Sequence, residues 1–163
     1  MTSTAVAAVT ALAGTAALIA WLRRRFVVIN VDGPSMQPTL YEGDRVLVRR
    51  RPLWHLRAGD IVVVEKAGHR RPGRHRRVAA RGSRNLSGHR WVIKRVAAVP
   101  GDPVPASVAA AVSAPAGARV PDGRLLVLGD NSGRSLDSRH YGYLPGDGVL
   151  GVVVRQMHRH HQG

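Results

Sequence analysis

Residues 90–99 read RWVIKRVAAV, an apolar run with one lysine, Lys94, near its middle. The run is short and rich in β-branched residues, and it lacks a helical stripe, so it predicts a strand. Burial disfavours the charged form of an amine, so apolar neighbours are expected to lower the pKa of Lys94. A neutral lysine amine is a competent general base and activates the serine in the Ser–Lys variant of the serine hydrolases. The residues that flank Lys94 and would desolvate it are Val92, Ile93, Val96 and Ala97.

Five similar runs surround this one, and turn-forming segments rich in Gly, Pro and Asp separate them. The pattern predicts a mainly β chain that forms a compact barrel-like or multi-sheet domain. Residues 103–121 are rich in Ala and Pro, and we expect them to form a long excursion or a short helix between strands. The five runs are FVVINV (26–31), DRVLVRR (44–50), DIVVVEK (60–66), RLLVLG (124–129) and VLGVVVR (149–155).

The N-terminal segment 2–22, TSTAVAAVTALAGTAALIAWL, contains no charged residue. As a helix it would extend roughly 31 Å, enough to cross the hydrocarbon core of a bilayer. Trp21 and the arginines at 23–25 would mark its end at the membrane surface. The alternatives are a cleaved signal peptide, a buried core helix and a disordered leader, but a signal peptide usually carries its positive charges before the apolar region. The segment therefore predicts a retained transmembrane anchor.

Composition bounds the chemistry. The chain has 163 residues, which predicts one domain, and it has no cysteine, which excludes disulfides, thiol nucleophiles and thiolate metal sites. A formal net charge of +15 indicates an anionic partner or surface, although the scarcity of aromatic residues argues against a nucleic-acid platform. The block 66–90 holds nine Lys and Arg residues and no acid, so it is either a solvated loop or a contact for anionic lipid headgroups. The His-rich tail 156–163 is expected to be solvated rather than a metal site.

Three ordered segments carry the groups that could do chemistry: GPSMQPTL (33–40), VIKRVAAVPGD (92–102) and GDNSGRSLDSRHYG (129–142). Together they resemble the sequence boxes of the type I signal peptidases, the Ser–Lys proteases that remove leader peptides from exported proteins. The flanking segments GDRVLV (43–48) and GDIVVV (59–64) fit the strand boxes of the same family. The resemblance covers roughly residues 27–155, and it implies a signal-peptidase-like β-fold catalytic domain of minimal size.

The resemblance also implies the catalytic roles. Ser35 would attack the scissile carbonyl, and Lys94 would take its proton as the general base. Ser135 matches the position whose hydroxyl orients the lysine amine. Asp130 and Asn131 are expected to shape the turn of the last box through side chain to backbone hydrogen bonds.

Four further positions complete the implied site. Asp137 and Arg139 match a structural ion pair that holds the last box against the site, and Met36 would line the substrate pocket. Gly33 stands where some members have a serine that assists the oxyanion hole. The oxyanion would then rest mainly on backbone N–H groups, that of Ser35 among them.

These inferences predict a membrane-anchored serine endopeptidase that removes N-terminal signal peptides from exported preproteins and needs no metal or organic cofactor. It would bind an extended leader by β-augmentation and admit small side chains near the cut. One alternative is a Ser–Lys protease with another task, either maturing one dedicated precursor or cleaving itself like a repressor. The other is a non-catalytic basic protein that binds membrane or nucleic acid, which the intact Ser35, Lys94 and Ser135 argue against.

The orientation of the catalytic domain is also a prediction. The resemblance places it on the extracytoplasmic face of a single-pass cell-membrane protein. The positive charges at 23–25 favour the reverse orientation by the positive-inside rule. Long domains translocate largely regardless of charge, so the extracytoplasmic face is the prediction retained.

Overall fold

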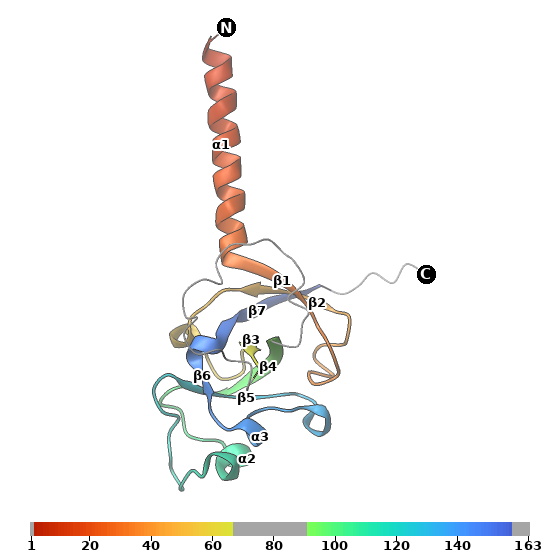
Figure 1. Ribbon diagram of the computed structural model, residues 1–163, viewed down its shortest axis with the longest axis vertical. Coiled ribbons are helices and arrows are strands. Elements are labelled where there is room, and N and C mark those ends of the chain that lie inside the picture. The colour runs from red at the N-terminus through yellow and green to blue at the C-terminus, as the bar shows by residue number, and fades with distance from the viewer. Residues whose placement is uncertain (1, 67–90, 158–163) are drawn as a thin grey trace, which may run out of the picture.

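The computed structural model describes residues 2–66 and 91–157, and its centre is one seven-stranded antiparallel sheet (Figure 1). The strand order is β1-β2-β7-β3-β4-β5-β6, so the last strand of the chain lies between β2 and β3. Each of the six predicted strands is present, and the short β6 is an addition. The strands are β1 (Phe26–Asn30), β2 (Arg45–Arg49), β3 (Ile61–Glu65), β4 (Trp91–Ala98), β5 (Arg124–Leu128), β6 (Leu144–Pro145) and β7 (Val149–Met157).

Strand β3 shows how the sheet is packed. Val63 joins one apolar cluster, which includes Ile29 and Val46, whereas Val62 and Val64 join a second cluster. Successive side chains of a strand point to opposite faces, so β3 is covered on both sides. This explains why its sequence is a continuous apolar run rather than an alternating one.

Short helices fill the connections around this sheet. The predicted excursion 103–121 contains α2 (Ala106–Ala109) and the 3-10 turn η2 (Ala110–Val112), and a bridge between Pro103 and Arg119 closes its base. Val108 and Val120 from this excursion pack with Ala98 and Leu126 in a third cluster. The other short elements are η1 (Leu53–His55), η3 (Ser132–Arg134), α3 (Ser138–Tyr141) and η4 (Gly146–Gly148).

The N-terminal segment forms helix α1 (Thr2–Arg25), which projects away from the sheet (Figure 1). The predicted helix is therefore present, and it continues through the three arginines. Within the described residues, however, no helix combines the length and the hydropathy that crossing a membrane requires. The prediction of a transmembrane anchor is not confirmed.

Two of the predicted features lie outside the described residues. They are the basic block, from residue 67 to residue 90, and residues 158–163 of the His-rich tail.

Candidate active site

Ser35 lies in a tight turn that follows β1. The backbone reverses through Gly33, whose φ of +80° is a conformation that L side chains rarely adopt. Two backbone hydrogen bonds then fold the turn onto itself, from Gln37 N to Pro34 O at 3.1 Å and from Leu40 N to Met36 O at 2.9 Å. Met36 is only 1% exposed and packs into the first apolar cluster. The turn is therefore anchored in the core through Met36, which offers little surface to a substrate.

Lys94 lies in the middle of β4 and is 3% exposed. Val62 is its direct partner on β3, and Val96 stands on the same face two residues further along β4. Both valines belong to the second apolar cluster, so the lysine stem extends along a hydrophobic surface. Desolvation by this burial is the largest influence on the pKa of Lys94, and it lowers the pKa below the ordinary lysine value.

Gly129 is the point at which the nucleophile turn, the base strand and the last sequence box meet. Arg95 pairs with Leu128, and continuing this antiparallel register by one residue places Lys94 beside Gly129. A Cβ atom on Gly129 would lie 2.1 Å from Ser135 Oγ and 2.6 Å from Ser35 O. Asn131 N also donates to Ser35 O at 3.0 Å. The backbone of the nucleophile turn and the hydroxyl of Ser135 are thus packed directly against Gly129.

Asp137 organises the loop that carries Ser135. Its carboxylate accepts hydrogen bonds from Gly129 N at 2.8 Å and from Ser135 Oγ at 2.7 Å. Arg139 closes a bidentate pair with the same carboxylate, with Nε to Oδ1 at 3.0 Å and Nη2 to Oδ2 at 2.6 Å. These charge-assisted hydrogen bonds outweigh desolvation and hold the pKa of Asp137 well below its usual range. Ser135 donates its proton to Asp137, so its oxygen lone pairs remain free to accept.

The Asp137–Arg139 pair also bears on the charge of Lys94. The negative charge of Asp137 raises the pKa of Lys94, whereas the positive charge of Arg139 lowers it. Arg139 therefore offsets part of the effect that the Asp137 carboxylate has on the pKa of Lys94. The pair therefore supplies a hydrogen-bond acceptor for the loop without cancelling the effect of burial on Lys94.

A second ion pair joins the same segments on the other face of β4. Arg95 binds Asp130 through Nε to Oδ1 at 2.8 Å and Nη2 to Oδ2 at 2.7 Å, and its Nη1 donates to Gly59 O at 2.9 Å. Thr39 in the nucleophile turn donates its hydroxyl to Asp130 and accepts from Arg95 Nη2 at 3.3 Å. The pair lowers the pKa of Asp130. We call Thr39, Arg95 and Asp130 the clamp, because they tie the nucleophile turn to the base strand and the last box.

Sequence reasoning missed the clamp and the role of Gly129. It predicts only a turn-shaping role for Asp130, and it assigns no role to Arg95 or Thr39. The signal for a partnership is present in the sequence, since Arg95 directly follows Lys94 and Asp130 is the second residue of the last box. Pairing them, however, requires the register between β4 and β5.

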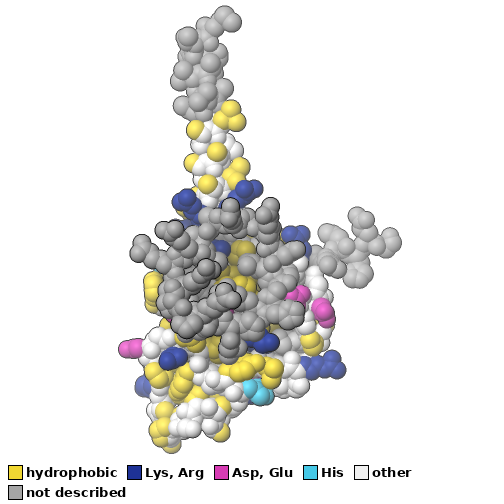
Figure 2. Space-filling view, viewed as in Figure 1, with side chains coloured by type: hydrophobic (Ala, Val, Ile, Leu, Met, Phe, Trp, Pro, Cys, Tyr) yellow, Lys and Arg dark blue, Asp and Glu magenta, His cyan; other side chains and the backbone are white. Residues whose placement is uncertain are grey.

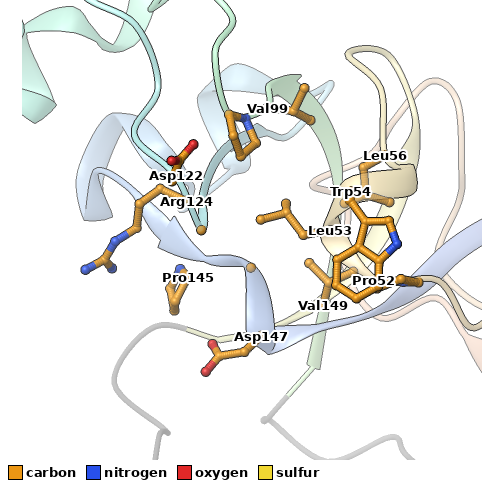
Figure 3. A pocket seen from close by; sticks show the side chains of 13 residues that line it. Pro52, Leu53, Trp54, Leu56, Val99, Asp122, Arg124, Pro145, Asp147 and Val149 are labelled. Carbon is orange, nitrogen blue, oxygen red and sulfur yellow. The ribbon is translucent and has the colours of Figure 1, made fainter.

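The predicted site residues come from three separate segments and meet around the start of the last box. Gly33 and Ser35 lie in the turn after β1, Lys94 lies on β4, which pairs with β5 just before the last box, and Asp137 of the ion pair accepts a hydrogen bond from Ser135. A large cavity of about 1030 Å³ lies elsewhere, between η1, η4 and the beginning of β5 (Figure 3). None of the predicted catalytic residues lines that cavity, so it is distinct from the candidate site.

The sequence pattern of the family described as signal peptidase, peptidase S26, matches residues 3–113 and 106–157. The chain is 31% identical over 140 residues to a probable signal peptidase I-2 of Synechocystis sp., an alignment that covers 74% of this chain and 58% of that protein. It is also 31% identical over 163 residues to a probable signal peptidase I-1 of Synechocystis sp., covering 85% of this chain and 76% of that protein. The chain therefore belongs to the signal peptidase family, peptidase S26.

Proposed function

We propose that this protein is an endopeptidase that removes signal peptides from preproteins, with Ser35 as the nucleophile and Lys94 as the general base. The observation that carries the proposal is the burial of Lys94 beside Gly129, against which Ser35 and Ser135 are both packed. The names of the relatives from Synechocystis sp. support the choice of preproteins as substrates.

The proposed reaction proceeds in two steps, acylation of Ser35 and hydrolysis of the resulting ester. The neutral amine of Lys94 takes the proton of Ser35 Oγ as the oxygen attacks the scissile carbonyl, and the C–N bond then breaks. The proton passes to the departing amine, and the leader remains as an ester on Ser35. A water molecule, deprotonated by Lys94, attacks the ester carbonyl, the bond to Ser35 Oγ breaks as that oxygen takes the proton back from Lys94, and the leader is released as a carboxylic acid. Backbone N–H groups near Ser35, with Gly33 allowing the tight approach, would stabilise the oxyanion of both steps.

The roles of the remaining residues follow from their contacts. Ser135 would accept a hydrogen bond from the Lys94 amine while donating to Asp137, so it would aim the lone pair of the amine at Ser35. Met36 would form the floor beneath the nucleophile rather than an exposed pocket wall. The leader would bind as an extended strand, because the turn directly follows an edge strand of the sheet, β1.

The deciding experiment incubates the full chain with a preprotein and follows release of the leader. Ser35→Ala and Lys94→Ala should each reduce the rate by about 10³-fold or more, and the double variant should be no slower than either single one. Matched controls are Ser132→Ala, an exposed serine of the last box, and Lys66→Ala, at the other lysine of the chain. Both controls should remain active. If Lys94→Ala kept the wild-type rate, Lys94 would not be the base.

A further inference from the structure

The cavity between η1, η4 and the beginning of β5 has an apolar interior (Figure 3). Its volume of about 1030 Å³ is enough for a sizeable ligand, since ligand pockets range from roughly 300 to 1,000 Å³. The catalytic chemistry proposed above does not use it. The apolar side chains that line it include Pro52, Leu53, Trp54, Leu56, Val99 and Val149.

The walls of the cavity are held in place by close packing and by backbone hydrogen bonds. Leu53 packs so tightly against Gly146 that a Cβ atom there would lie 2.3 Å from the leucine side chain. Gly146 N donates to Gly123 O at 2.8 Å, which ties η4 to the start of β5. Leu56 N donates to Leu53 O at 3.0 Å, and both leucines pack in the second apolar cluster. The cavity is therefore preformed.

Trp54 gives this cavity an exposed aromatic rim. It is 80% exposed, more than any other large apolar side chain that the structure describes. Tryptophan is enriched among the residues that dominate binding energy at interfaces. Figure 3 shows Trp54 on one side of the cavity and Asp122 and Arg124 on the other. Because the rim carries charges of both signs, in a chain of net charge +15, an apolar ligand fits it better than a polyanion.

Two short paths connect the cavity to the candidate active site. Val99, in its wall, follows Lys94 by five positions along β4 and its end, which is at most about 17 Å. Leu56, in the opposite wall, precedes Gly59 by three positions, at most about 11 Å, and Gly59 O accepts the hydrogen bond from Arg95 of the clamp. Apolar side chains also reach the surface of the body between separate Lys and Arg side chains on the face shown in Figure 2. A peptide bound at the catalytic centre could therefore reach the cavity within a few residues.

We propose that this cavity is a second binding site for the preprotein and takes apolar side chains of the leader upstream of the cut; the proposal rests on the proposed function. A leader carries an apolar region of about 7–15 residues, followed by small residues at the cleavage site. Five extended residues span about 17 Å, so a leader with its cleavage site at Ser35 would bring the end of its apolar region to Trp54. The cavity would add affinity for the leader and take no part in the chemistry.

The test compares two dye-labelled peptides that share one cleavage site. One has about ten apolar residues before the small residues, and the other has Ser and Gly in their place. Fluorescence anisotropy measures their binding to the full chain carrying Ser35→Ala, which prevents turnover. We expect the apolar peptide to bind about 10-fold more tightly, and Trp54→Ala to remove most of this difference.

Two further variants control for the loss of an aromatic ring. Trp54→Phe keeps a ring at the rim and should retain most of the difference in affinity. Trp21→Ala removes a tryptophan that is 48% exposed on α1, outside the cavity, and should retain all of it. Melting temperatures identify any variant that does not fold. Equal affinities for the two peptides, or equal losses in Trp54→Ala and Trp21→Ala, would overturn the proposal.

Cleavage assays with Ser35 intact separate this proposal from the proposed function. Trp54→Ala should raise KM for the apolar peptide about 10-fold, leave kcat unchanged, and change neither value for the Ser/Gly peptide. If the wild type cleaved neither peptide, the proposed function would fail, while the binding measurements would still decide the role of the cavity. A third peptide carries the apolar residues downstream of the cut. If Trp54→Ala weakened binding of that peptide alone, the cavity would bind the mature part of the preprotein and the assignment to the leader would be wrong.

Discussion

The charge of Lys94 is the property of a single residue on which the proposed chemistry depends most. Because burial lowers its pKa, the amine should lose its proton below the ordinary value of about 10.4. We expect kcat/KM to rise with pH through that lowered pKa and then to level off. A pH–rate profile with soluble peptide substrate measures it. If kcat/KM did not change with pH over this range, while Ser35→Ala was inactive, Lys94 would not be the base.

The same burial makes a prediction about stability. The folded state binds fewer protons than the unfolded state between the lowered pKa and about 10.4, so the free energy of unfolding should rise with pH across that window. Lys94→Met keeps the stem and removes the titrating group. It should be inactive, should melt at a higher temperature than the wild type at neutral pH, and should lose this pH dependence. Thermal melts of both proteins from neutral to alkaline pH check the sign.

A substitution in the clamp should slow catalysis in a protein that still folds. Asp130→Asn weakens the bidentate pair with Arg95 and the hydrogen bond from Thr39, so the nucleophile turn should shift relative to β4. Small misplacements of reacting groups cost much in rate, and we expect kcat to fall about 10- to 100-fold with KM little changed. The matched control is Asp122→Asn, an exposed carboxylate away from the site.

A double-variant cycle then separates the two partners of the clamp. If Arg95→Gln combined with Asp130→Asn loses no more than either single variant, the two side chains act as one unit. Additive losses would show that the two side chains act independently, and that the clamp does not act as one unit on the nucleophile turn.

The sequence predicts the individual residues of the site better than it predicts the contacts between them. The burial of Lys94 follows from its apolar neighbours, and the three boxes nominate Ser35 and Ser135. The resemblance implies that Met36 lines the substrate pocket, whereas the structure buries it in the first apolar cluster. An apolar side chain in a turn packs inward when the core lies directly beneath it. The clamp joins residues that lie 91 positions apart in the chain, from Thr39 to Asp130, and only tertiary structure brings them together.

At the scale of elements, the turn after β5 depends on the absence of a side chain at Gly129. Gly129→Ala would place a methyl group against Ser135 Oγ and the backbone oxygen of Ser35, at separations that real Cβ atoms essentially never show. We expect activity to fall by at least about 100-fold. Gly133→Ala in the same loop meets no atom within 4 Å and should behave like the wild type. Initial rates and melting temperatures of the two variants make the comparison, and full activity of Gly129→Ala would mean that the loop can move away.

The strands were predictable because each is a compact apolar run bounded by turn residues. β4, expected over 90–99, occupies Trp91–Ala98, and β7, expected over 149–155, extends to Met157. β6 has only two residues, Leu144–Pro145, and is held by pairing with β5 rather than by a pattern of its own. The short helices α2 and α3 are single turns of four residues. Such turns depend on packing, since isolated helices of that length are not stable in water.

The order of strands is a property of the whole molecule that no local pattern contains. β7 comes last in the chain and still lies between β2 and β3, so the sheet is complete only when the C-terminal segment has joined it. Gly151 on β7 permits this insertion, because a Cβ atom there would lie 2.2 Å from Arg49 O on β2. Turn chemistry predicts where strands end, but it cannot choose among such long-range pairings.

Helix α1 gives the last prediction, because it is long and yet none of its described side chains, those from residue 12 to residue 25, belongs to the three apolar clusters. Removing residues 1–22 should therefore leave the sheet and the site intact. We expect the melting temperature to change by no more than about 4 °C and kcat on a soluble peptide to stay within about twofold. Calorimetry and peptide cleavage by the truncated chain measure the two quantities. If the truncated chain unfolded, α1 would have to be counted as part of the folding unit.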